Sequence, residues 1–189
     1  MTKTKKQKIT SAATCVKKVP AALKKFERFL KMLRLPEAYM AEVDSVLDYG
    51  GGKYDVFGDE LARLSGNRIQ TFVYDPYNRS EEHNKLVRQL LTQRPADLAF
   101  CNCVLNVIQE KEVRAELLRD IQQLTKQDAF IVFSVYEGDK TGKGKITSKG
   151  FQANRKLSSY WPEIKKAFKG TGEAVEYNGL IVVHSRGPS

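Results

Sequence analysis

The chain has 189 residues, 41% of them hydrophobic and 29% charged, and a net charge of +10. This composition is typical of a folded domain and excludes a disordered or fibrous protein. No apolar run approaches the roughly eighteen residues of a membrane span, and no signal-peptide segment follows the basic start, so we expect a cytoplasmic protein with no membrane partner. Cys15, Cys101 and Cys103 give neither a disulfide framework nor zinc-ligand spacing, and no metal site is expected.

The excess of positive charge lies at the N-terminus. Residues 1–34 contain nine Lys and two Arg against one acid, whereas the rest of the chain contains 21 basic and 21 acidic residues. We expect residues 1–18 to form a flexible basic arm and residues 19–43 a helical cover, with apolar residues at helical spacing: Val19, Leu23, Phe26, Leu30 and Leu33. Such charge is typical of nucleic-acid binding, but it serves an acidic protein partner or a solubilising tail equally well.

From residue 44 onward, short apolar runs alternate with helical patterns. The predicted order is a strand at 45–48, a helix at 54–64, a strand at 68–74, a helix at 80–91, a strand within 97–105, a helix at 110–124, a buried strand at 129–136 and a helix at 158–168. The chain then forms an antiparallel hairpin, 174–177 with 180–183, about Asn178-Gly179. Residues 137–150 are expected to be one long irregular loop. The alternation predicts an α/β fold, a Rossmann-like three-layer sandwich with a mainly parallel sheet.

Two segments at the ends of predicted strands have the chemistry of ligand binding, because parallel sheets bind ligands at the carboxyl ends of their strands. In the first, Asp48 precedes three glycines at 50–52, which let the backbone approach a ligand closely. A dinucleotide pyrophosphate suits this loop, and so does an amino-acid ligand whose ammonium pairs with Asp48. In the second, Asp75 precedes Pro76 and is predicted to accept hydrogen bonds from ribose hydroxyls, although Asp-Pro is also ordinary turn chemistry.

A third segment, residues 101–106, follows the next predicted strand. Asn102 is a candidate for the edge of an adenine ring, and Val104 or Leu105 for its face. The alternative interpretation is core packing with a capping Asn, and this is the better one for the two cysteines taken alone.

In this order the segments resemble the motifs of class I S-adenosylmethionine-dependent methyltransferases. Residues 46–55 look like the D-x-G-x-G loop of that family, Asp75 like its ribose-binding acid and residues 96–106 like its strand-four motif. With residues 136–139 and 150–154, the set is similar to small methyltransferases of bacteria and their phages. The resemblance covers roughly residues 44–184 and marks 44–189 as the methyltransferase domain.

The resemblance implies that S-adenosylmethionine is the cofactor. The cofactor-binding residues it implies are Asp48, Tyr49, Gly50, Gly51, Gly52, Asp55, Asp75, Pro76, Asn102, Cys103 and Val104. The family fold has seven strands, but between Asp75 and Asp97 there is room for one helix only. We therefore expect a fold that is one strand-helix unit shorter.

The sequence does not identify the methyl acceptor. It has neither the Asp/Asn-Pro-Pro-Tyr motif of amino-methylating DNA enzymes nor the Pro-Cys nucleophile of cytosine-5 enzymes. Asn106, Tyr136 and Glu137 are predicted to contact the acceptor, with surface solvation as the alternative for Glu137. His83 and His184 lie within predicted elements and are expected to be structural. The lysines of the loop at 139–149 either supply positive charge near a phosphate or belong to a plain connection.

Two other functions fit parts of the pattern. One is a protein that binds the cofactor without transferring its methyl group, and that docks on nucleic acid or a partner protein through residues 1–34. The other is a nicotinamide-dependent oxidoreductase, which is disfavoured because Asp55 stands where the third glycine of the dinucleotide fingerprint belongs. Nothing in the sequence indicates an oligomeric state.

Overall fold

The computed structural model describes residues 18–148 and 150–185, so the predicted basic arm, apart from Lys18, lies outside the described residues. The elements in chain order are α1 (Ala21–Met32), α2 (Pro36–Glu42), β1 (Ser45–Tyr49), α3 (Val56–Ser65), β2 (Gln70–Tyr74), α4 (Glu81–Gln93), β3 (Ala96–Asn102), the 3-10 helix η2 (Leu105–Val107), α5 (Lys111–Leu124), β4 (Thr125–Ser134), β5 (Lys145–Thr147), β6 (Gly150–Gln152), the 3-10 helix η3 (Leu157–Tyr160), α6 (Trp161–Ala167), β7 (Gly172–Tyr177) and β8 (Leu180–Ser185).

The main sheet has the strand order β2-β1-β3-β4-β8-β7. Strands β2, β1, β3 and β4 run parallel to their neighbours, and β8 and β7 add an antiparallel edge. The predicted mainly parallel sheet with a C-terminal hairpin is therefore confirmed. Only α4 separates β2 from β3 in the chain, and β2 is an edge strand, so the fold is shorter than seven strands, as expected. Chain order reverses between β1 and β3, which is where such sheets form a ligand crevice.

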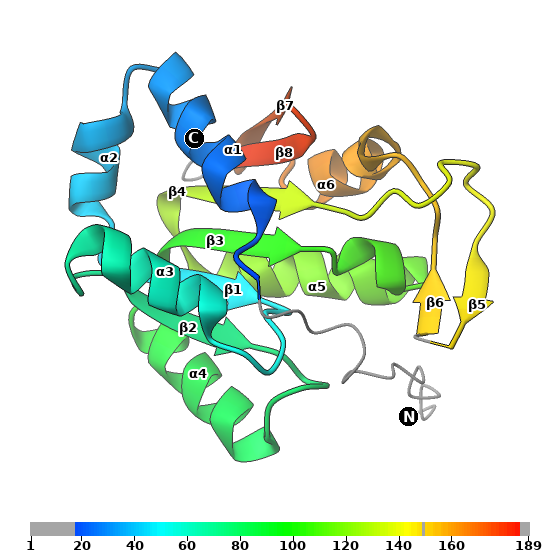
Figure 1. Ribbon diagram of the computed structural model, residues 1–189, viewed down its shortest axis with the longest axis horizontal. Coiled ribbons are helices and arrows are strands. Elements are labelled where there is room, and N and C mark those ends of the chain that lie inside the picture. The colour runs from blue at the N-terminus through cyan, green and yellow to red at the C-terminus, as the bar shows by residue number, and fades with distance from the viewer. Residues whose placement is uncertain (1–17, 149, 186–189) are drawn as a thin grey trace.

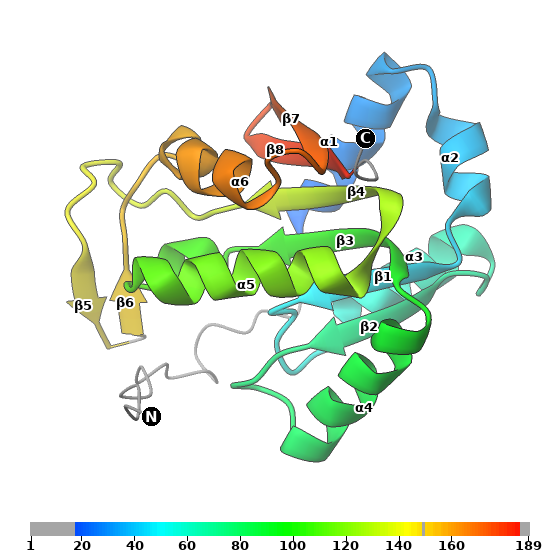
Figure 2. The same cartoon turned by 180° about the vertical axis from the view of Figure 1, so that it is seen from behind.

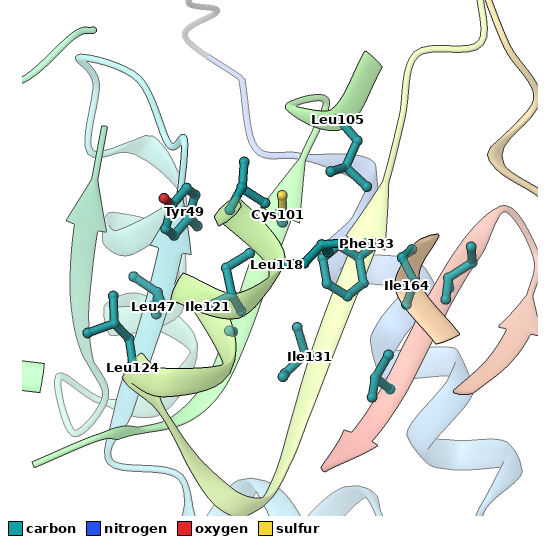
Figure 3. Close-up of a cluster of buried hydrophobic side chains, with 14 of the residues drawn as sticks. Leu47, Tyr49, Cys101, Leu105, Leu118, Ile121, Leu124, Ile131, Phe133 and Ile164 are labelled. Atoms are coloured by element: carbon teal, nitrogen blue, oxygen red, sulfur yellow. The ribbon is translucent and has the colours of Figure 1, made fainter. Parts of the chain in front are cut away.

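Helices cover both faces of the sheet. Figure 1 shows α1, α2 and α3 over one face, and Figure 2, from behind, shows α4, α5 and α6 over the other. Successive strand residues alternate between the two layers: Val46 and Leu98 belong to the core under α1 and α3, whereas Leu47 and Ala99 belong to the core under α4, α5 and α6. Figure 3 shows this second core, where Ile121 of α5 lies among strand residues. The strands are apolar on both sides because both sides are buried.

The N-terminal helix belongs to the core of the fold. In α1 the predicted apolar stripe is correct for Leu23, Phe26 and Leu30, which are buried, but wrong for Leu33, which is 40% exposed because it lies beyond the end of the helix. Phe29 is buried in its place. The ring of Phe26 meets Phe100 of β3 at 5.6 Å and Phe130 of β4 at 5.9 Å, both edge-on.

Two other expectations need correction, whereas the helical cover expected at residues 19–43 consists of two helices, α1 and α2. Residues 137–150 are not wholly irregular, because Lys145–Thr147 pairs with Gly150–Gln152 as a small antiparallel hairpin, β5-β6. The predicted helix at 158–168 is divided into η3 and α6, with a proline near the start of α6. None of the helices in the described ranges is both long enough and apolar enough to cross a membrane.

Replacing Phe26 tests whether α1 folds together with the sheet. Phe26→Ala should lower the free energy of unfolding by about 3–5 kcal/mol, because it removes a fully buried ring between α1 and two strands. Urea denaturation followed by circular dichroism measures this. Met32→Ala, at a position 53% exposed on the same helix, should change stability by no more than about 0.5 kcal/mol. Equal stability of the two variants would contradict a shared core.

Candidate ligand-binding cleft

A cleft of about 1550 Å³ opens at the carboxyl ends of the parallel strands. Ten of the eleven predicted cofactor-binding residues line it: Asp48, Tyr49, Gly50, Gly51, Gly52, Asp75, Pro76, Asn102, Cys103 and Val104. The three sequence segments therefore meet where the strand order reverses. Sequence reasoning missed other residues that line the cleft, among them Lys25 of α1, and Tyr54 and Phe57, which follow the glycine loop.

The glycine loop after β1 has a backbone that other residues would not adopt. Gly50 and Gly52 both have φ of +77°, in the left-handed region. A Cβ atom on Gly51 would lie 2.2 Å from Oδ2 of Asp48, and one on Gly50 would lie 2.4 Å from Cγ2 of Val104. The loop thus folds back over the Asp48 carboxyl and against the third segment, and each glycine is required by space or by conformation.

The Asp75 carboxylate joins the first segment to the second. Its Oδ2 accepts hydrogen bonds from the backbone N–H of Gly52 (2.9 Å) and from the side-chain amide of Asn78 (2.9 Å). Its Oδ1 accepts from the backbone N–H groups of Tyr77 (2.9 Å) and Asn78 (3.0 Å), which is the turn chemistry expected of Asp-Pro. Asp75 is only 3% exposed, and a ribose hydroxyl bound here would replace one of these four donors.

Arg79 is a site residue that the sequence did not reveal. Its Nε donates to the backbone carbonyl of Gly52 (2.7 Å), and its Nη2 pairs with Oδ1 of Asp55 (2.7 Å). Both polar groups of residue 52 are therefore held by the segment that begins at Asp75. Asp55 itself does not line the cleft: its side chain lies 60% exposed in the ion pair with Arg79. An arginine four residues after Asp75 is the only sequence signal for this contact.

The pKa of Asp48 is raised to about 7, and burial is the main cause. The Asp75 carboxylate contributes to this rise, the Arg79 guanidinium opposes it, and Asp55 adds a smaller upward effect. Asp48 is 3% exposed at the floor of the cleft. A positive charge in the cleft would therefore favour the ionised carboxylate.

The third segment combines a core cysteine with a strained turn. Cys101 is fully buried in the core, as expected of core packing, and Cys103 lines the cleft with φ of +57°. Oδ1 of Asn102 accepts a hydrogen bond from Ser134 (2.9 Å), whereas its Nδ2 is buried with no hydrogen-bond partner among the described residues. Asn102 thus lines the cleft with a donor that has no partner among the described residues.

The predicted acceptor residues lie in different places. Asn106 and Tyr136 line the cleft and are connected by Gln152: Nδ2 of Asn106 donates to Oε1 of Gln152 (3.0 Å), and Nε2 of Gln152 donates to the Tyr136 carbonyl (2.9 Å). Glu137 does not line it. Its Oε1 accepts from the Leu157 backbone N–H (2.8 Å), the main cause of its lowered pKa, and its Oε2 pairs with a lysine.

Tyr49 and the histidines have structural contacts. The Tyr49 hydroxyl donates to Oδ2 of Asp120 (2.8 Å), so it is directed at α5. Nε2 of His83 contacts the carbonyl of Val73 (2.8 Å), and the ring of His184 stacks on Phe130 at 4.6 Å. Neither histidine lines the cleft, in agreement with the structural role expected from the sequence.

The raised pKa of Asp48 can be measured by carbon-13 NMR of the aspartate carboxyls. The ligand-free protein should show a midpoint near 7. Asp75→Asn should lower this midpoint and Arg79→Gln should raise it. Because the folded state holds a proton that the unfolded chain has lost, stability should fall from about pH 4 to 7 relative to Asp48→Asn. A midpoint below 5 would contradict the burial of an uncompensated carboxyl.

Comparisons with protein-family models and with curated proteins give no match. Among solved structures, the chain is similar to the 1,6-didemethyltoxoflavin-N1-methyltransferase of Burkholderia thailandensis with bound 1,6-didemethyltoxoflavin and S-adenosylhomocysteine, at 17% identity and a TM-score of 0.54 over 88% of this chain and 79% of that one. It is also similar to an S-adenosylmethionine-dependent methyltransferase from Clostridium acetobutylicum, at 12% identity and a TM-score of 0.54 over 87% and 92%.

A third similar structure is the apo form of the S-adenosylmethionine-dependent methyltransferase SibL, at 16% identity and a TM-score of 0.50. The match covers 87% of this chain but 56% of SibL, so the chain spans little more than half the length of that protein. At identities this low the likeness concerns the fold. The chain has the fold of the class I S-adenosylmethionine-dependent methyltransferases.

Proposed function

We propose that this protein is an S-adenosylmethionine-dependent methyltransferase. The observation that supports this most strongly is the meeting of three distant segments in one cleft: the Asp48 loop, Asp75, and residues 102–104. They line the crevice at the strand-order reversal, in the order that the family motifs follow. The methyltransferase fold supports the same function but does not carry it alone, because a fold hosts many functions.

The residues present fit the cofactor. Residues 50–52 carry no side chains, so this loop meets a ligand with its main chain alone. Asp48, with its pKa near 7, would be stabilised in its charged form by a ligand that carries an ammonium and a sulfonium. The buried Asn102 amide is a donor that a purine nitrogen would satisfy.

Each segment then has a role in holding the cofactor. Asp48 pairs with the ammonium, and the loop of Gly50, Gly51 and Gly52 lies against the amino-acid end. Asp75 accepts a ribose hydroxyl in exchange for one of its present donors; the Asn78 side chain is the one that can leave without releasing the glycine loop. Pro76 flanks the ribose, and Asn102, Cys103 and Val104 contact the adenine. Tyr49 and Asp55 act indirectly, through α5 and Arg79.

The acceptor is held on the other side of the cleft, beside Asn106 and Tyr136. When bound, S-adenosylmethionine supplies an electrophilic methyl group whose bond to sulfur breaks, with the electron pair left on sulfur, as the acceptor atom bonds to carbon. The protein's contribution is alignment, which lowers such a barrier by up to about 7–11 kcal/mol. No histidine lines the cleft, so the acceptor must be nucleophilic without a histidine base.

Calorimetry with S-adenosylmethionine tests the cofactor assignment. Affinity should be about tenfold weaker at pH 6 than at pH 8, because only the ionised form of Asp48 pairs with an ammonium and its pKa is about 7. Asp48→Asn should weaken binding and remove this pH dependence. The control is Asp59→Asn, at an exposed position of α3, which should bind like the unmodified protein. Absence of heat at millimolar cofactor would contradict the proposal.

Methyl transfer is tested with radiolabelled S-adenosylmethionine against DNA, RNA, protein and small-molecule pools. We expect label in one pool, and none with Gly50→Val, whose side chain would collide with Val104 in a left-handed backbone conformation. Label in the nucleic-acid pools would agree with an acceptor guided by the basic residues 1–34. Cofactor binding without label in any pool would instead favour a non-catalytic binding protein.

A further inference from the structure

A second basic segment lies far from the N-terminus in the sequence. Residues 137–170 contain nine Lys and Arg against three acids, Glu137, Asp139 and Glu163. Residues 35–189 as a whole are neutral, so this segment is a local concentration of positive charge. It comprises the loop after β4, the β5-β6 hairpin, η3 and α6.

The three acids of this segment are occupied by other contacts. Glu137 accepts from the Leu157 backbone and pairs with Lys140 at 3.2 Å. Asp139 accepts from the backbone and hydroxyl of Thr141. Glu163 forms a bidentate pair with the buried Arg114, at 2.7 and 3.0 Å, and also pairs with Arg155 at 3.4 Å. In the described part of the chain, several exposed lysines here therefore have no salt bridge: Lys143, Lys145, Lys156, Lys165, Lys166 and Lys169.

Part of this charge gathers around a second, smaller cavity. Its volume is about 400 Å³, and it is lined by three cations and three hydroxyl side chains, together with Gly142: Lys140, Arg155, Lys156, Thr141, Ser158 and Ser159. The neighbouring Lys143 is fixed by its carbonyl, which accepts from Nδ2 of Asn154 (3.2 Å). We define the basic face as Lys140, Lys143, Lys145, Arg155 and Lys156.

The β5-β6 hairpin connects the basic face to the large cleft. The hairpin that carries Lys145 also supplies Phe151 and Gln152 to the cleft wall. Gln152 bonds to both Asn106 and the Tyr136 carbonyl, and the Ala153 N–H donates to the Asn106 carbonyl at 2.8 Å. Figure 1 shows β5 and β6 beside the carboxyl ends of the strands, at the end of the sheet where the cleft opens. Lys145 is therefore paired in the hairpin with Gln152, which lines the cleft.

The walls of the cleft differ in charge. The lining residues supplied by residues 134–152, next to the basic face, include no acid, and Lys18 and Lys25 line the cleft from the segment that contains α1. The acids that line the cleft are Asp48, Asp75, Glu116 and Asp120; Arg88 and Arg119 line it beside the last two, and Arg88 pairs with Asp120. Aromatic rings accompany the cations, namely Tyr54, Phe151 and Tyr136, whose side chain is 64% exposed.

We propose that the basic face binds the phosphate backbone of a polynucleotide whose unstacked base enters the cleft beside Tyr136. Clustered cations attract phosphates, and adjacent aromatic rings stack on bases, whereas an acidic protein would use the charge but not the rings. The identity of this polynucleotide as the methyl acceptor rests on the proposed function. Binding itself does not, because it requires neither cofactor nor transfer.

Fluorescence anisotropy with labelled twenty-nucleotide DNA and RNA, single-stranded and duplex, tests the proposal on the full chain without cofactor. K143A/K145A/K156A should weaken single-strand binding about tenfold or more. The slope of log affinity against log salt should fall by about 2, since each phosphate contact on a single strand contributes about 0.7. The matched control is K85A/R94A/K126A, which removes three exposed cations from α4, its C-terminal end and β4.

An equal loss in the two triple variants, or no loss in either, would overturn the proposal and leave any binding to residues 1–34 or to net charge. Competition by poly-aspartate, or by vesicles with anionic lipid, as effective as that by unlabelled single strand would overturn it in favour of another acidic partner. Calorimetry with S-adenosylmethionine should give the same affinity for K143A/K145A/K156A as for the unmodified protein. Failure of the cofactor proposal would therefore be seen separately from failure of this one.

Discussion

The cleft depends on how the backbone of one residue, Gly52, is held. Its N–H donates to Asp75 and its carbonyl accepts from Arg79, so the loop after β1 is fixed by the loop after β2 at both of its polar groups. The loop needs such support because it combines two left-handed glycines with a close contact between Gly51 and a buried carboxyl. Asn84 in turn fixes the backbone of Asp75. Its side-chain amide donates to the Asp75 carbonyl and accepts from the Asp75 N–H, both at 2.9 Å. The two loops are therefore a single structural unit.

The arrangement of the fold could be predicted because the capping and turn residues agree with the order of strands and helices along the chain. The helix α4 begins where expected, since Ser80 accepts from the His83 N–H as an N-cap, and the terminal hairpin turns at Asn178-Gly179, both with positive φ. The β5-β6 hairpin was missed because its strands have three residues each, and β5 is exposed throughout, so neither has an apolar period. Leu33 was misassigned because the helical period continues in the sequence past the residue where α1 ends.

The site residues could be predicted where the path of the backbone determines their positions. They could be predicted less well where the contacts of long charged side chains determine them. The glycine loop, Asp75 and Asn102 are fixed by their positions at strand ends, so sequence order places them in the same cleft. Asp55 was assigned to it from the resemblance of residues 46–55 to a family motif, and Glu137 from its place after a strand, but each finds a charged partner instead, Arg79 and Lys140. The partner of a long cationic side chain cannot be inferred from the spacing of residues in the sequence. For the same reason Arg79 itself was overlooked.

Because the sheet is short, the proposed ribose position and the basic face lie at different ends of the cleft. Asp75 follows β2, the edge strand, so the proposed ribose position lies at the outer rim, where Tyr77 is 44% exposed. The basic face lies across the cleft, beyond the end of β4. The proposed cofactor and polymer positions are therefore at different ends of the cleft, so spent cofactor can be replaced while a polymer stays bound. Such a layout permits processive modification, in which one enzyme molecule acts repeatedly on the same strand before dissociating.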